Sequence, residues 1–269
     1  MTTAAATAIP GAESAVGAVL FEANGLSVSF GGIKAVRDVS FTIRPGEVFS
    51  IIGPNGAGKT TVFNLVSRFY DAETGTMAYE GNDITSVPTH RIAALGIART
   101  FQNTELFEHE TVLTNLLIGH HVHRHTNLAT DLLFLPRARG QELEFRRKAE
   151  DVIDLLDLQR YREQPIGSLP YGARKMVEIA RALCLEPKLL LLDEPSSGLN
   201  PEETEDLSFW IEDIVADLGV TVAMVEHDMN LVATVSDRVM AMADGAEVAT
   251  GEPAEIQQHP DVLRAYLGH

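Results

Sequence analysis

A glycine-rich stretch with one lysine and two threonines follows an apolar run in this sequence. It reads GPNGAGKTT, residues 53–61, and comes directly after residues 48–52. Glycines allow backbone conformations that point consecutive N–H groups inward, and they let a bulky anion approach the main chain. A helix beginning after Gly58 would present its positive N-terminus to the same anion. The pattern therefore predicts a polyphosphate-binding loop between a strand and a helix.

Two side chains of this loop have defined tasks in the prediction. Lys59 would place one cation among the β- and γ-phosphates of a nucleotide, and the Thr60 hydroxyl would coordinate Mg²⁺. A chance glycine-rich turn is the alternative, and the strand before the loop and the helix after it argue against that. The candidate nucleotide-binding residues are Gly53, Pro54, Asn55, Gly56, Ala57, Gly58, Lys59, Thr60 and Thr61.

Two carboxylates stand at the end of a run of four leucines, residues 189–192. Open α/β sheets bind ligands at the carboxyl ends of their strands, so Asp193 would reach the Mg²⁺ shell. Glu194 lies one residue further on and would orient and polarise an attacking water molecule. A helix cap after Pro195 could account for one of the two acidic residues but not for both. The pair is thus predicted to complete a nucleotide-hydrolysing site.

The elements that must hold these residues show two kinds of periodicity. Some short segments alternate apolar and polar side chains or are continuously apolar, as half-buried and buried strands are. Between about residues 112 and 185, apolar side chains recur instead at helical spacing. A helix is also predicted after Gly58, with Val62, Leu65, Val66 and Phe69 on its apolar face. The strand candidates are residues 26–30, 39–43, 48–52, 77–79, 189–192 and 220–225, and Asp244-Gly245 predicts a hairpin turn. We expect an α/β fold.

In their order along the chain, these motifs resemble those of ABC-type ATPases, the nucleotide-binding subunits of transporters. Thr100-Phe-Gln102 resembles the Q-loop, and Glu226-His227-Asp228 resembles the switch region. Ser197-Gly-Leu-Asn200 stands where the family has its D-loop. The resemblance covers about residue 20 to the C-terminus. It implies an ATP hydrolase with a P-loop NTPase core, an antiparallel β subdomain and an inserted helical subdomain.

The expected domain organisation follows from that resemblance and from the change in periodicity. The domains expected are a disordered leader (1–19), the N-terminal part of the ATPase core with the β subdomain (20–103), the helical signature subdomain (104–187), the C-terminal part of the core (188–252), and a short helical tail (253–269).

The resemblance also implies roles for individual residues. Glu194, His227 and Gln102 would be catalytic, and Thr60, Gln102 and Asp193 would contact the metal. Phe30 would stack on the adenine, contributing roughly 1–3 kcal/mol as aromatic side chains do for bases. Ala35 would line the adenine edge. The alternatives are a structural histidine at 227, a surface glutamine at 102 and a core phenylalanine at 30.

One motif departs from the family pattern. Most members read Leu-Ser-Gly-Gly-Gln where this chain reads Leu169-Pro-Tyr-Gly-Ala173. The family's serine reaches the γ-phosphate of ATP held by a partner subunit, and Pro170 has neither a hydroxyl nor an N–H. Proline suits the first position of a helix, so Tyr171 and Gly172 remain candidates to contact the nucleotide through the helix N-terminus. We expect the two ATP sites of the assembly to be unequal.

The finer resemblance is to the larger ATP-binding subunit of branched-chain amino-acid transporters. It rests on the Tyr171-Gly172 pair and on a tail that ends in RAYLG at residues 264–268. It implies a second ABC ATPase subunit and two integral membrane permeases as partners, and indirectly a periplasmic substrate-binding protein. This subunit would be cytoplasmic and peripheral on the inner face of the cell membrane. The alternatives are a homodimeric ATPase of a lipid-export system, a non-transport ABC ATPase and a P-loop kinase.

Composition restricts the classes of function. The 269-residue chain has a formal net charge of −17, whereas a nucleic-acid-binding surface is normally basic. It has no run of roughly 18 apolar residues that would span a membrane. The single cysteine, Cys184, excludes an intrachain disulfide and is expected to be buried. His120, His121, His123 and His125 cluster without a neighbouring cysteine or carboxylate, and a solvated loop is preferred there over a metal site.

Overall fold

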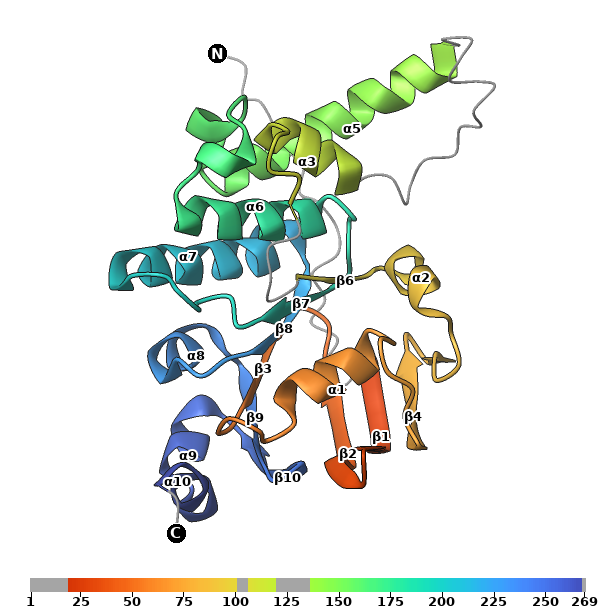
Figure 1. The fold of residues 1–269 in the computed structure, drawn as a ribbon, viewed down its shortest axis with the longest axis vertical. Coiled ribbons are helices and arrows are strands. Elements are labelled where there is room, and N and C mark those ends of the chain that lie inside the picture. Colours follow the sequence, from red (N-terminus) through yellow and green to blue (C-terminus); the bar gives the residue numbers. More distant parts are fainter. Residues whose placement is uncertain (1–18, 101–105, 120–135, 268–269) are drawn as a thin grey trace, which may run out of the picture.

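Two β-sheets form the frame of the molecule (Figure 1). The computed structural model describes residues 19–100, 106–119 and 136–267 of the chain. The leader up to residue 18, Gln102 and the histidines at 120–125 lie outside the described residues, so the predictions for them stay predictions.

The smaller sheet is antiparallel and has the strand order β2-β1-β4-β5. Two of its strands begin earlier than the alternation of apolar and polar residues predicted: β1 begins five residues before Leu26, and β2 begins six residues before Val39. The strands are β1 (Phe21–Phe30), β2 (Ile33–Ile43), β4 (Thr74–Tyr79) and β5 (Asn82–Asp83).

The larger sheet has six strands in the order β10-β9-β3-β8-β7-β6. Its neighbouring strands are parallel except for β9 and β10, which form the hairpin predicted from Asp244-Gly245. Because β3 lies between β9 and β8, and β7 lies beside β8, the carboxyl ends of β3, β7 and β8 share one edge of the sheet. The strands are β3 (Val48–Ile52), β6 (Ile97–Arg99), β7 (Leu189–Asp193), β8 (Thr221–Val225), β9 (Arg238–Ala243) and β10 (Ala246–Gly251).

Helices cover the larger sheet on both sides and account for the helical segment between β6 and β7 (Figure 1). The predicted helix after Gly58 is α1, and it ends at Val66. Phe69 therefore does not belong to its apolar face: its side chain lies beyond the helix and is 52% exposed. The helices are α1 (Lys59–Val66), α2 (Thr89–Ile92), α3 (Val112–Gly119), α5 (Pro136–Leu155), α6 (Tyr171–Leu183), α7 (Pro201–Leu218), α8 (Met229–Val235), α9 (Pro253–Gln258) and α10 (Pro260–Leu267). Short 3₁₀ turns are η1 (Ala93–Leu95), η3 (Gln159–Tyr161) and η4 (Ile166–Ser168).

The larger sheet separates two hydrophobic cores, because successive residues of a strand point to opposite faces. In β7, Leu190 and Leu192 pack toward the helical side, whereas Leu189 and Leu191 pack toward α1 and the smaller sheet. All five residues of β7 are buried. This explains why the strand reads as an uninterrupted apolar run rather than as an alternating one.

Candidate active site

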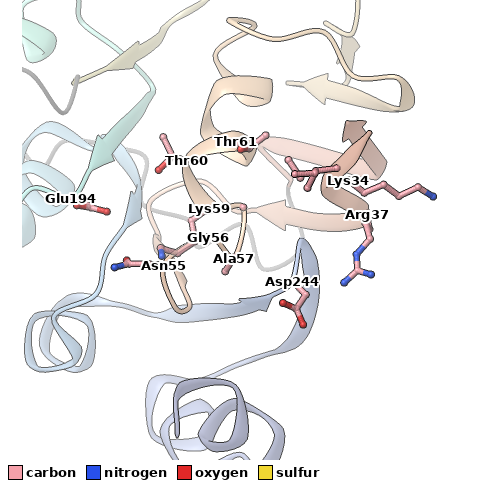
Figure 2. Close-up of a pocket in the computed structure, with 13 residues that line it drawn as sticks. Lys34, Arg37, Asn55, Gly56, Ala57, Lys59, Thr60, Thr61, Glu194 and Asp244 are labelled. Atoms are coloured by element: carbon pink, nitrogen blue, oxygen red, sulfur yellow. The ribbon is translucent and has the colours of Figure 1, made fainter. Parts of the chain in front are cut away.

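The glycine-rich loop joins β3 to α1 at the carboxyl edge of the larger sheet, and it forms one wall of a cavity of about 680 Å³ (Figure 2). Glu194 faces the same cavity from the end of β7. The cavity therefore contains two groups that the sequence predicts to act together, although they are far apart along the chain. Its lining residues are Ile33, Lys34, Ala35, Arg37, Asn55, Gly56, Ala57, Gly58, Lys59, Thr60, Thr61, Glu194 and Asp244.

Two glycines of the loop are required by close contacts within the chain. Gly53 has φ +151°, and a Cβ there would lie 2.2 Å from the Met242 carbonyl oxygen. Gly58 has φ +96°, and a Cβ there would lie 2.4 Å from the Ala35 carbonyl oxygen. A larger residue at either position would displace backbone rather than a flexible side chain, so both glycines fix the loop against β9 and β2.

The β9–β10 turn links the loop to β2. The Gly245 N–H donates to the Ala57 carbonyl at 3.1 Å, and the Gly245 carbonyl accepts from the Arg37 N–H at 2.7 Å. No side chain caps the N-terminus of α1 within the described chain, so its first amides remain available to an anion. The loop is thus held by the β9–β10 turn, while the N–H groups at the start of α1 stay open to the cavity.

Lys59 is buried against the loop that carries it. Its Nζ donates to the carbonyls of Gly53 and Pro54 at 2.7 and 3.2 Å. Burial lowers the pKa of the Lys59 ammonium, and the nearby carboxylates of Glu194, Asp193 and Glu226 oppose that shift. The lysine therefore lies beside an acidic group of residues, where a bound polyphosphate would add a further anionic partner.

Among the described residues, one carboxylate oxygen of Asp193 has a hydrogen-bond partner and the other has none. Its Oδ2 accepts from an Arg99 guanidinium nitrogen at 2.7 Å, and the two side chains are only 2% and 7% exposed. Its Oδ1 is buried and makes no hydrogen bond among the described residues. A buried carboxylate oxygen without a partner is costly, and Mg²⁺ prefers oxygen ligands, so this atom fits a metal shell completed from the cavity.

Glu194 adopts an uncommon backbone conformation. Its φ is +49°, in the left-handed region that costs a residue other than glycine on the order of 1–3 kcal/mol. The Glu194 N–H donates to the Val225 carbonyl at 2.9 Å, which anchors the residue to β8. Its carboxylate points into the cavity toward the side of Lys59 (Figure 2). The strained backbone is thus held by neighbouring elements and turns this side chain out of the apolar strand.

Glu226 organises the turn that carries His227. Glu226 is fully buried, and its carboxylate accepts from the Ser196 N–H and the His227 N–H, both at 2.8 Å. It thereby joins the turn after β8 to the turn after β7. The His227 side chain is 57% exposed, with Nδ1 3.8 Å from Glu226 Oε2. His227 does not line the cavity, so its predicted catalytic role stays a prediction.

The alternative that Phe30 is a core residue is wrong, because this side chain lies at the surface. The residue is 45% exposed, and its ring meets the Tyr70 ring edge-on, with centroids 4.9 Å apart. Ala35 lines the cavity, whereas Phe30 stands outside the lining at the end of β1, and the predicted contact of Ala35 with adenine stays a prediction. The structure thus leaves Phe30 available for stacking without itself testing that role.

The predicted partner-facing residues lie away from this cavity, at the N-terminus of α6. Pro170 was expected to be the first residue of the helix, but it is the N-cap residue, and α6 begins at Tyr171. The Tyr171 hydroxyl donates to the Ser197 carbonyl of the same chain at 3.3 Å. A Cβ at Gly172 would lie 2.3 Å from a carboxylate oxygen of Glu203, so an acidic group already lies against this glycine.

Several residues around the cavity were missed in the sequence. Lys34 and Arg37 line it from β2, and their positive charges in a strongly acidic chain were the available signal. Arg99 was assigned no role from the sequence. Tyr266 of α10 was noted only within the tail, yet it lies beside the loop: burial raises the pKa of its phenol, and a hydrogen bond with the Gly53 backbone opposes that shift.

Comparisons with known proteins agree with this arrangement. A family model described as "ABC transporter" matches residues 36–197, and one described as "Branched-chain amino acid ATP-binding cassette transporter" matches residues 248–269. The chain is also similar to a solved ATP-binding cassette of an ABC transporter in its ADP conformation. That similarity has a TM-score of 0.81 and 30% identity, and it covers 94% of this chain and 100% of the other.

Two curated relatives match nearly the whole chain. The high-affinity branched-chain amino acid transport ATP-binding protein BraF of Pseudomonas aeruginosa is 41% identical, over 93% of this chain and 98% of its own length. The corresponding protein LivG of Escherichia coli is 40% identical over the same shares.

Proposed function

This chain belongs to the ABC transporter family, and from that membership we propose that it is the ATP-hydrolysing subunit of an importer for branched-chain amino acids. The observation that carries the proposal is the cavity in which Lys59 and the loop amides face Glu194. The C-terminal match to the branched-chain transporter model favours this function over lipid export, a non-transport ABC ATPase and a P-loop kinase.

The chain's own residues would bind and orient the triphosphate. The amides from Gly56 to Thr61 would surround the phosphates, and the N-terminus of α1 would add its positive end. Lys59 would exchange its two carbonyl acceptors for phosphate oxygens, which is favourable because a charged acceptor forms the stronger hydrogen bond. Lys34 and Arg37 lie where they would lower the negative potential at the mouth of the cavity.

Thr60 and Asp193 would hold magnesium. The buried Oδ1 of Asp193, which has no hydrogen-bond partner among the described residues, supports this. Gln102 is proposed as a further ligand from outside the described residues. When bound, the ion neutralises charge on the phosphate oxygens. Arg99 would hold the Asp193 carboxylate in place by donating a hydrogen bond to its other oxygen.

Glu194 would orient the attacking water and accept its proton. Its carboxylate is partly buried and faces the loop across the cavity. His227 is proposed to bridge Glu194 and the γ-phosphate from the neighbouring turn. Hydrolysis of ATP would then remove the contacts that this phosphate makes with both turns.

The proposed partners are a second ABC ATPase subunit and two membrane permeases, served by a periplasmic substrate-binding protein. Within the described ranges, no helix has both the length and the apolar character needed to cross a bilayer. The permeases would supply the path through the membrane. Tyr171 and Gly172 would face ATP held by the second subunit, with Pro170 weakening that contact relative to the family's serine.

The experiment that tests the function is Glu194→Gln in the complex purified with its permeases. ATP binding should persist, and hydrolysis should fall by about 10²–10⁴-fold, the usual contribution of a positioned general base. Nucleotide binding is measured with a fluorescent ATP analogue and turnover by phosphate release. Lys59→Ala should instead weaken binding itself, because it removes the cation among the phosphates.

The transported solute is tested by reconstitution in proteoliposomes. ATP-driven uptake of leucine that Glu194→Gln abolishes is the expected result. A Glu194→Gln complex that hydrolyses ATP at the wild-type rate would contradict the role of Glu194. Normal hydrolysis in the wild-type complex without uptake of any branched-chain amino acid would contradict the solute.

A further inference from the structure

One face of α6 contacts the turn that follows Glu194. Tyr171 and Lys175 are four residues apart on this helix and therefore project from the same side. The Lys175 Nζ donates to the Glu194 carbonyl at 3.1 Å, and the Tyr171 hydroxyl donates to the Ser197 carbonyl at 3.3 Å. The two contacts fall at the two ends of residues 194–197.

The turn itself is tightly specified. The Ser197 N–H donates back to the Glu194 carbonyl at 3.1 Å, so this oxygen accepts from both Ser197 and Lys175. Gly198 has φ +82°, and a Cβ there would lie 2.7 Å from a carbon of the Tyr171 ring. The ring thus lies directly on the glycine, and a larger residue at position 198 would separate α6 from the turn.

The hydrogen bond from Lys175 to the Glu194 carbonyl matters because the lysine is buried. Lys175 is 4% exposed, and an ammonium group so far from solvent is costly unless it donates to hydrogen-bond acceptors. The acceptor is the carbonyl of a residue whose left-handed backbone needs support from its surroundings. A hydrogen bond from a charged donor is also stronger than one from a neutral donor.

We propose that Lys175 is a positioning residue for Glu194, and that with Tyr171 it joins the N-terminus of α6 to the turn that aims the Glu194 carboxylate. The inference rests on the proposed function of Glu194. Under this inference, the Tyr171-Gly172 segment also supports the turn after Glu194 in its own chain. A nucleotide of the partner subunit that pushes on the N-terminus of α6 would thereby move the Glu194 carboxylate in this chain's own site.

The test compares three lysine variants in the complex purified with its permeases. Lys175→Met should lower kcat for ATP hydrolysis by about 10–100-fold, as loss of a supporting contact behind a reacting group commonly does. KM for ATP should change by less than about twofold, because the nucleotide is held by other residues. Lys175→Arg, which keeps a charged donor, should recover part of kcat. The matched control is Lys148→Met, which removes a half-buried lysine of α5 that pairs with Glu186 and should leave kcat unchanged.

A double-mutant comparison separates positioning from general damage to the fold. In the Glu194→Gln background, Lys175→Met should cause no further loss of the residual hydrolysis, because there is no base left to position. An equal loss in both backgrounds, or no loss in the wild-type background, would overturn the inference alone. A wild-type rate in Glu194→Gln would overturn the proposed role of Glu194 and with it the inference.

A milder variant keeps the proposal testable if Lys175→Met does not fold. Tyr171→Phe removes one exposed hydroxyl and should speed amide hydrogen exchange at residues 194–199 in the nucleotide-free complex, a readout that needs no catalysis. The control is Tyr161→Phe, which removes a tyrosine hydroxyl from η3 and should leave the exchange at residues 194–199 unchanged. Equal exchange in Tyr171→Phe and wild type would contradict the contact between α6 and the turn.

Discussion

At the scale of single residues, the site depends on a buried ion pair that local sequence does not reveal. Arg99 donates to Asp193, to Asn64 Oδ1 and to Ser67 Oγ, at 2.7, 2.7 and 2.8 Å. Its guanidinium therefore connects the end of β7 with α1, the helix that begins at Lys59. Neutral side chains could fill this space, but none would compensate a buried carboxylate that lies 2% exposed.

Removing the arginine should be costly to stability. In Arg99→Met the Asp193 carboxylate stays buried without its cation, and we expect the free energy of unfolding to fall by about 3 kcal/mol, as for other broken buried pairs. Urea denaturation followed by circular dichroism measures it. The control is Arg264→Met, which breaks the exposed pair with Asp261 and should change the free energy by less than about 1 kcal/mol.

The double variant Arg99→Met with Asp193→Asn identifies the cause. With the carboxylate neutralised as well, part of the lost stability should return, because the uncompensated charge is gone. If the double variant is less stable than Arg99→Met alone, the loss comes from packing around the guanidinium and the electrostatic explanation is wrong.

At the scale of elements, prediction succeeded where the signal is local. The loop at residues 53–61 and the strand β7 were predictable because the glycine spacing and the apolar run are contiguous. Arg99 and Lys175 were not, because their partners depend on β6 lying beside β7 and on α6 packing over the following turn. Phe69 fits the helical period but lies past the end of α1, where the chain turns at Arg68 with φ +60°.

Helix α7 offers a test at this scale, since it begins directly after the turn that Tyr171 contacts. The Asn200 side chain accepts from the Glu203 N–H at 3.0 Å, and the Glu203 carboxylate accepts from the Asn200 N–H at 2.9 Å. Asn200→Ala removes one half of this capping box and should lower the free energy of unfolding by about 1 kcal/mol. Asn200→Ser keeps a capping oxygen and should lie within a few tenths of wild type. Equal losses in the two variants, measured by urea denaturation, would show that the cap is not the cause.

At the scale of the whole molecule, the larger sheet separates two hydrophobic cores, and each core includes residues far from the site. Cys184, at the end of α6, is 1% exposed and belongs to the core on the helical side. A Cβ at Gly119 would lie 2.9 Å from its Cβ, which shows how closely α3 approaches. The sole thiol of the chain is therefore a reporter of the integrity of this core.

Burial also predicts a pH dependence for this core. It raises the pKa of the Cys184 thiol to about 12 from an ordinary value of 9.0, with the Glu186 carboxylate as a smaller cause. The folded state thus keeps a proton that the unfolded state loses, so this contribution to stability is complete below pH 9.0 and declines as the pH rises toward about 12. Cys184→Ala should show a shallower decline than wild type, measured as the free energy of unfolding in urea at a series of pH values. Because Tyr79, whose phenol pKa is also raised by burial, is present in both proteins, its titration cancels in the difference. In native protein at neutral pH the thiol should resist alkylation until urea unfolds the chain, and rapid labelling of the folded protein would show that this core opens independently.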